Sequence, residues 1–204
     1  MRIKIILSSL AFLYFFLTGC NLKQESNNAL IEAKFNIDDN LLDTIPFIDS
    51  SLYLSIQKPI KWTNLDSGFE TTIKSSLLTN DYKDANLTGG FFNRQDSSFM
   101  VILDISSVDS MGFSNLRNNY TEILNKNNFW NNIQFQEFKH GCYRIEQYVL
   151  QNEQILNFKL ICYEIGLERR QPKFEILYIL NRKKIEENIK SIESSIGSLK
   201  CITF

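Results

Sequence analysis

The chain of 204 residues has one histidine, three prolines and eight glycines, and each scarcity excludes a class of protein. Few glycines and prolines argue against a fold dominated by loops. With His140 alone, a zinc site would depend on cysteines or carboxylates, and no spacing gathers these around it. The glycine-rich phosphate loop and the Gly-x-Ser-x-Gly nucleophile elbow are also missing. We therefore expect no metal, no cofactor and no enzymatic activity, and we interpret His140 as an exposed turn residue.

An excess of positive charge and a long apolar run are lacking as well. The chain has 22 basic and 23 acidic side chains, so its charge gives no case for binding nucleic acid. The N-terminal apolar run, residues 5–17, is shorter than the roughly 20 residues that a membrane-spanning helix needs. Arg2 and Lys4 precede this run, and small residues follow it. This order predicts that residues 1–19 are a secretory signal peptide.

The signal segment leads into Leu17-Thr18-Gly19-Cys20, which resembles the lipobox of bacterial lipoprotein precursors. The resemblance implies a diacylglyceryl group on the thiol of Cys20, cleavage before Cys20, and acylation of the new amino terminus by a fatty acid such as palmitate. An ordinary signal peptide, or a membrane helix with a chance cysteine, is the alternative. Asn21 is not the aspartate associated with retention in the inner membrane. We therefore expect a lipid-anchored protein of the bacterial cell envelope, in the outer membrane and facing the periplasm.

Composition divides the remaining chain into two parts. Residues 20–45 are rich in Asn, Asp, Glu and Gln, and we expect them to form a lipidated, flexible tether. Residues 46–204 have the length and the apolar content of a single globular domain. No internal repeat or interior linker divides this domain.

Apolar spacing predicts both strands and helices in the domain. Residues 99–105 are almost continuously apolar, as expected of a central strand covered on both faces. Residues 142–165 alternate on either side of a turn and predict a long hairpin, which residues 174–180 extend into a meander. Spacings of three and four predict amphipathic helices over residues 113–124 and 185–199, the second of which has a coiled-coil seam as its alternative. Shorter strands are expected at residues 52–56, 69–73, 89–92 and 133–138.

The predicted hairpin brings two of the three cysteines of the domain, Cys142 and Cys162, onto neighbouring strands. A two-residue turn at Asn152-Glu153 pairs residues whose numbers sum to 305, which brings the apolar faces of both strands together. Cys162 then faces Tyr143, and a cysteine at position 142 points to the opposite side of the sheet. We therefore expect free, largely buried thiols at Cys142, Cys162 and Cys201.

Other polar and aromatic residues suggest no catalytic arrangement. The carboxylates from which a glycoside-hydrolase pair would have to be drawn are Asp104, Asp109, Glu146 and Glu164. A small basic group, which we interpret as a charged turn, consists of Arg169, Arg170 and Lys173. The aromatic residues that could line a groove, but that more often form core, are Phe91, Phe92, Phe129 and Trp130. We interpret the preceding Gly89-Gly90 as a turn or bulge.

The order of the expected elements resembles the PsbP/Mog-like fold. It comprises a strand ending in SIQKPIKW, a glycine turn, a central strand, a helix, a meander and a closing helix ending in SIESSIGSL. The resemblance implies an α+β fold, an antiparallel sheet flanked by helices in an αβα sandwich, with a lipocalin-like barrel as the alternative. It also implies a non-enzymatic accessory or protein-binding role, whose protein partner the sequence does not identify. The aromatic content favours a second function, a carrier for a small apolar ligand.

Overall fold

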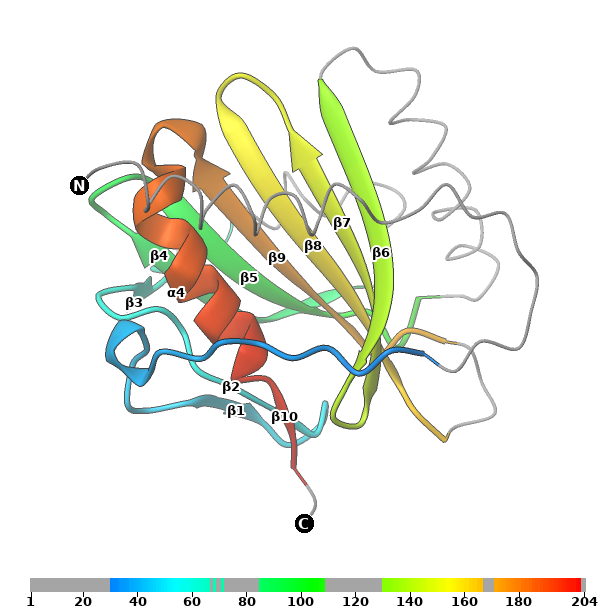
Figure 1. Ribbon diagram of the computed structural model, residues 1–204. Helices are drawn as coiled ribbons and strands as arrows, with labels where there is room; N and C mark the ends of the chain where they lie inside the picture. Colours follow the sequence, from blue (N-terminus) through cyan, green and yellow to red (C-terminus); the bar gives the residue numbers. More distant parts are fainter. Residues whose placement is uncertain are drawn as a thin grey trace.

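The computed structural model of the chain describes residues 30–66, 68, 71, 85–108, 130–166 and 171–202. Strands dominate this part and form two antiparallel sheets (Figure 1). The larger sheet has seven strands in the order β3-β4-β5-β9-β8-β7-β6. Their bounds in that order are Thr63–Asn64, Asn86–Asn93, Ser98–Asp104, Phe174–Asn181, Ile155–Glu164, Tyr143–Gln151 and Asn132–His140. The smaller sheet consists of β1 (Phe47–Asp49), β2 (Leu54–Ile56) and β10 (Lys200–Cys201).

The fold is β-rich, so the expected αβα sandwich with flanking helices is wrong. Within the described residues, α4 (Ile185–Gly197) is the one α-helix with defined bounds, and the 3-10 turns η1 (Asp39–Leu41) and η3 (Arg182–Lys184) accompany it. Together, α4 and the small sheet cover one face of the large sheet (Figure 1). Strands therefore form part of the layer that was expected to consist of helices. No helix in the described part is both long and apolar enough to cross a bilayer. The helix expected over residues 113–124 lies outside the described residues. Of the strand expected over 69–73 only Thr71 is described, and it is helical, which contradicts the strand.

The main core lies between the large sheet and this cover. Strand β8 contributes the alternate residues that the sequence predicts, Leu156, Phe158, Leu160 and Cys162. The apolar stripe of the C-terminal helix also faces the core as predicted, with Ile192, Ile196 and Leu199 buried and Ile185 and Ile189 at the margin. Both periodicities therefore identify residues that face the core.

The predicted hairpin and meander are confirmed, but the register of the hairpin differs. Val149 pairs with Phe158, so paired numbers sum to 307 instead of 305. The cause is the side chain of Asn152, whose Oδ1 accepts hydrogen bonds from the backbone N–H groups of Gln154 and Ile155, both at 2.8 Å. This Asx-type closure lengthens the loop beyond two residues. A shift of two keeps every side chain on its predicted face.

Residues 31–38, which we call the strap, lie against the domain although they belong to the expected flexible tether. Ala33 N donates to Lys139 O at 2.8 Å, and Lys139 N donates to Ile31 O at 2.9 Å. Farther along, Asp38 N donates to Ser194 Oγ of α4 at 3.0 Å. The folded part of the chain therefore extends N-terminally beyond the expected boundary at residue 46.

Candidate functional site

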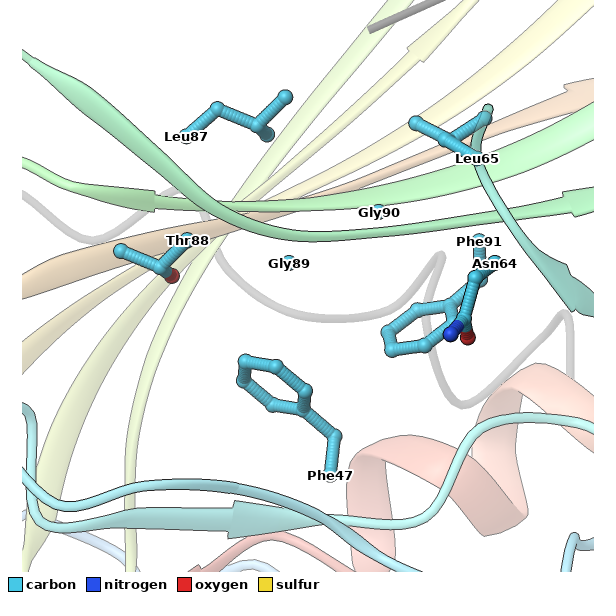
Figure 2. Close-up of a pocket in the computed structure, with 8 residues that line it drawn as sticks. All are labelled: Phe47, Asn64, Leu65, Leu87, Thr88, Gly89, Gly90 and Phe91. Atoms are coloured by element: carbon cyan, nitrogen blue, oxygen red, sulfur yellow. The ribbon is translucent and has the colours of Figure 1, made fainter. Parts of the chain in front are cut away.

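A half-open cleft of about 220 Å³ lies at the edge of the large sheet, where β3 diverges from β4 (Figure 2). Strand β3 pairs only with Phe91 and Phe92, and Leu65 N donates to Gly90 O at 3.0 Å just beyond them. Among the described residues, no strand pairs with the outer side of residues 86–89. The lining residues are Phe47, Asn64, Leu65, Leu87, Thr88, Gly89, Gly90 and Phe91.

Two adjacent glycines let side chains approach β4 from both faces. A Cβ at Gly89 would lie 2.9 Å from Cζ of Phe47, and a Cβ at Gly90 would overlap Leu65. The expected turn is wrong, because Gly89 and Gly90 both pair with β5 inside β4. The ladder shifts between Leu87 and Gly89, so a bulge lies next to the glycine pair. The extra residue, Thr88, donates from Oγ1 to Ile102 O at 3.3 Å. Because the two glycines have no Cβ, Phe47 and Leu65 can pack directly against the backbone of β4 and form the walls of the cleft.

The chemistry of the cleft suits recognition. Its polar side chains are those of Asn64 and Thr88, and none of its lining residues is ionisable. Acid–base catalysis needs a titratable group in reach of the substrate, which this lining does not supply. The volume is below the roughly 300–1,000 Å³ of typical small-molecule sites. A strand edge beside an apolar pocket is the arrangement by which extended peptides add to a sheet.

The face of the large sheet opposite α4 contains buried charges. Lys159 Nζ lies 2.9 Å from Glu175 Oε2, and their side chains are only 1% and 3% exposed. Arg144 pairs with Glu137 and, at 3.0 Å, with the fully buried Glu146. Each of these carboxylates faces a cation, as buried charges require, so we assign them a structural role.

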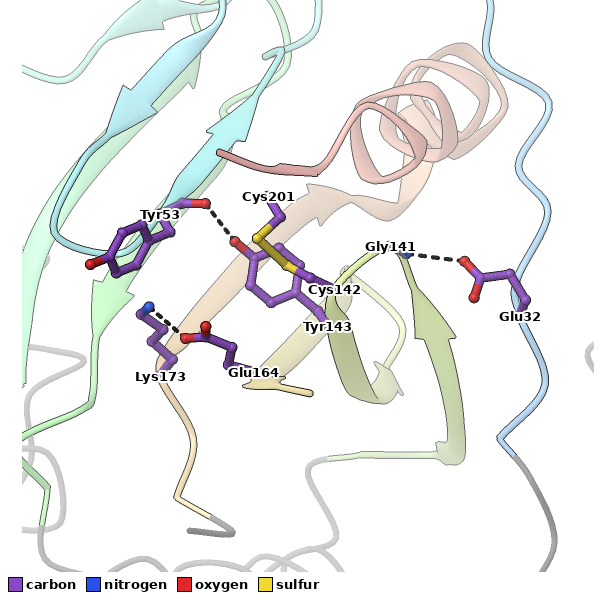
Figure 3. The surroundings of a disulfide bond; sticks show 8 residues. All are labelled: Glu32, Tyr53, Gly141, Cys142, Tyr143, Glu164, Lys173 and Cys201. Carbon is purple, nitrogen blue, oxygen red and sulfur yellow. Dashed lines mark hydrogen bonds and ion pairs between the residues drawn. A yellow bond between two sulfur atoms is a disulfide. The ribbon is translucent and has the colours of Figure 1, made fainter. Parts of the chain in front are cut away.

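A disulfide joins Cys142, in the turn between β6 and β7, to Cys201 of β10 (Figure 3). The Cα atoms are 5.9 Å apart. The expectation of three free thiols is therefore wrong: among the described cysteines only Cys162 is free, and it is buried. The alternation of side chains in the hairpin correctly excluded a bond between Cys142 and Cys162. It gave no information on the position of β10, which carries the actual partner, Cys201. Burial raises the pKa of the Cys162 thiol well above its usual value, so this group is a poor nucleophile.

Packing around the disulfide fixes several backbone groups. Tyr143 donates its hydroxyl to Tyr53 O at 2.8 Å, and burial raises the pKa of that phenol. Lys173 Nζ lies 2.8 Å from Glu164 Oε2 and 4.0 Å from the centre of the Tyr53 ring. On the other side, Gly141 N donates to Glu32 Oε1 at 3.0 Å. The disulfide therefore sits between the small sheet and the strap.

His140 is not an exposed turn residue, which corrects the expectation. It is the last residue of β6 and is half-buried. Its Nε2 lies 3.1 Å from Gly197 O at the end of α4, and its ring packs edge-on against Phe35 of the strap, with centroids 4.9 Å apart. Strap and helix therefore cover the imidazole. Within the described residues, no three His, Cys, Asp or Glu side chains converge to hold a metal ion.

The candidate carboxylates that the structure describes have structural partners. Asp104 Oδ1 accepts from the backbone N–H and the hydroxyl of Ser106, at 2.9 and 2.6 Å. Glu146 and Glu164 pair with the cations named above. Asp109, and Arg169 and Arg170 of the basic group, lie outside the described residues.

The aromatic candidates are divided between core and cleft. Phe91 is buried, lines the cleft, and packs edge-on against Phe47 with ring centroids 5.7 Å apart. Trp130 packs against the apolar cluster on the opposite face of the sheet. Phe92 does not line the cleft, and Phe129 lies outside the described residues. Sequence reasoning missed Phe47 and Leu65, for which the only signal is the adjacent glycine pair that accommodates them.

Similarity to known proteins is found among solved structures. No family model matches the chain, and no curated protein matches it. The solution structure of cyanobacterial PsbP (CyanoP) from Synechocystis sp. PCC 6803 aligns with 88% of this chain and 98% of its own chain, at 11% sequence identity and a TM-score of 0.42. The neighbour is thus PsbP-like, as is the fold that the sequence resembles. A similarity of this size does not establish a common fold or function.

Proposed function

We propose that this chain is a lipid-anchored accessory protein of the bacterial cell envelope that binds a protein partner and catalyses no reaction. The observation that carries the proposal is Leu17-Thr18-Gly19-Cys20 behind a basic and then apolar segment. Several acyl chains on one residue hold a protein at a bilayer almost permanently, because each buried CH₂ contributes about 0.8 kcal/mol. The outer membrane, facing the periplasm, is the proposed location.

The disulfide between Cys142 and Cys201 supports an envelope location from an independent direction. Disulfides persist in oxidising compartments such as the bacterial periplasm and are rare in the cytosol. Secretion and oxidation belong to the same route, so lipobox and disulfide agree.

The cleft beside β4 supports a partner-binding role. Its apolar walls and adjacent strand edge fit an extended protein segment, whose backbone would pair with residues 86–89 while one side chain enters the pocket. The alternative function, a carrier for a small apolar ligand, rests on the same apolar walls. The small volume favours the first function over the second.

Lipidation is tested by mass spectrometry of the N-terminal peptide and by labelling with palmitate. Wild-type protein should carry a thioether-linked diacylglyceryl group on Cys20 and fractionate with membranes, whereas Cys20→Ser should not be labelled. Cys162→Ala is the matched control and should be labelled as wild type. A native protein that retains residues 1–19, or that has a free thiol at Cys20, contradicts the anchor.

Partner binding is tested by crosslinking and capture of the anchored protein from cells. Asn64→Arg places a long side chain at the cleft rim from an exposed position, and it should abolish the crosslinked partner. Asn131→Arg, an exposed asparagine that does not line the cleft, should retain it. Native mass spectrometry separates the alternative: a small molecule that leaves in Asn64→Arg, with no captured protein, supports the carrier.

A further inference from the structure

The strap limits how far the domain can lie from its lipid. Its backbone is fixed to β6 from Ile31 onward, so at most ten residue steps separate Leu30 from Cys20. Ten steps span no more than roughly 36 Å when fully extended, and roughly 18 Å as a flexible coil. A flexible tether over residues 20–45, as expected from the sequence, would have allowed a much wider range of distances between the domain and the lipid.

This chain length also selects which end of the domain faces the lipid. Figure 1 shows the strap running across the molecule, from its start near the turn between β6 and β7 to η1 on the other side. The start of the strap is next to the disulfide, because Glu32 accepts from Gly141 beside Cys142. The end of the domain around the disulfide is therefore the one nearest to Cys20.

The side chains at this end suit the boundary between lipid and water. Ile31 is 79% exposed although its backbone is held by Lys139, and Leu30 and Ile165 are also exposed. Ile165 belongs to the same end because its N–H donates to Cys142 O at 2.8 Å. Tyr53 is exposed at the same end, where its carbonyl accepts from the hydroxyl of Tyr143, and it adds an aromatic side chain of the kind enriched at membrane interfaces.

The charges here give little attraction to anionic lipid. Lys173 pairs with Glu164, and Lys139 lies 3.6 Å from Glu32. Contact with the bilayer would therefore depend on apolar side chains and on the short connection, with little dependence on headgroup charge.

We propose that the corner formed by Leu30, Ile31, Tyr53 and Ile165, at the disulfide end of the domain, rests on the bilayer that holds the Cys20 lipid, with Ile31 among the headgroups. The inference rests on the proposed lipidation of Cys20. It gives the domain a fixed orientation relative to the bilayer.

The test places a tryptophan at either end of the strap region in full-length, lipidated protein. Ile31→Trp lies at the corner, and Ile45→Trp is the matched control because Ile45 is 75% exposed but lies beyond η1. Each variant is reconstituted in phosphatidylethanolamine vesicles with brominated acyl chains, and the quenching of Trp62 and Trp130 in wild type is subtracted. Emission from I31W should fall about twofold, since interfacial side chains lie within roughly 5–10 Å of the acyl boundary, and emission from I45W should not change.

Vesicle flotation separates the two levels of the proposal. Protein that floats with the vesicles but shows equal quenching in both variants, or none in I31W, overturns the orientation and leaves the anchor intact. Protein that does not float and lacks the lipid on Cys20 overturns the anchor and, with it, the orientation. Addition of anionic phosphatidylglycerol should leave the quenching of I31W unchanged, and a large increase would contradict the apolar contact.

Discussion

Reduction of the disulfide between Cys142 and Cys201 should remove about 4 kcal/mol from the free energy of unfolding. The bond spans a sequence separation of 59 residues. In the chain-entropy model, closing a loop of that length lowers the entropy of the unfolded chain by roughly 14 cal/mol/K, which is about 4 kcal/mol at 25 °C. Because a domain is typically stable by only about 5–15 kcal/mol, this single bond supplies a large share of the total.

The assay is urea unfolding of the oxidised and reduced protein, followed by tryptophan fluorescence. With a slope of about 1–3 kcal/mol/M, the midpoint should fall by roughly 1–4 M on reduction, and Cys142→Ser/Cys201→Ser should reproduce the fall without reductant. Cys162→Ala is the control, since it removes a thiol but no crosslink and should keep the full response to reductant. An unchanged midpoint in protein whose mass shows complete reduction would refute the loop-closure reasoning.

Three further changes test packing and charge. Gly197→Ala would place a Cβ 2.5 Å from Cβ of Phe35, so limited proteolysis of the strap should accelerate and stability should fall by roughly 1–3 kcal/mol. Lys159→Met leaves Glu175 buried without this cation and should cost roughly 3–5 kcal/mol in urea unfolding, much of which Lys159→Met/Glu175→Leu should restore. Burial raises the pKa of Glu193 from its usual 4.5, so the folded protein binds this proton more tightly than the unfolded chain does. The stability of the fold therefore falls as the pH rises from 4.5 through the raised pKa. Glu193→Gln should therefore raise the Tm at neutral pH and leave it unchanged below pH 4.5.

Periodicity predicted much of the sheet because burial acts on each strand separately. The alternation along β8 identified the residues that face α4 without any knowledge of its neighbours. The register of the hairpin could not be predicted from alternation alone, because it depends on the length and the hydrogen bonds of the loop. The side chain of Asn152 closes the turn on Ile155 and moves the pairing by two residues, and hydrophobic alternation with a period of two cannot detect such a shift.

Contacts between distant segments could not be predicted from spacing. Cys201 meets Cys142 because β10 pairs with β2, and β2 lies about 150 residues away in the sequence. The docking of the strap was missed as well, although residues 31–38 alternate between apolar and polar side chains. Ala33 and Phe35 of this run pack against the core. Their partners, His140 and Gly197, come from the end of a strand and the end of a helix, where no local pattern indicates a docking surface.

The charged face of the sheet shows why alternation does not reveal exposure. Along β8, Asn157 and Lys159 alternate with apolar residues, which is the pattern of a strand with one solvated face. The structure buries both faces, and Lys159 is tolerated because Glu175 lies on the neighbouring strand, opposite Ile161 and thus one diagonal step away. The attraction between two buried charges compensates the cost of removing them from water only when the strand register brings them into contact. Alternation therefore predicts which side chains share a face, while contact with water is decided by pairing and by whatever covers that face.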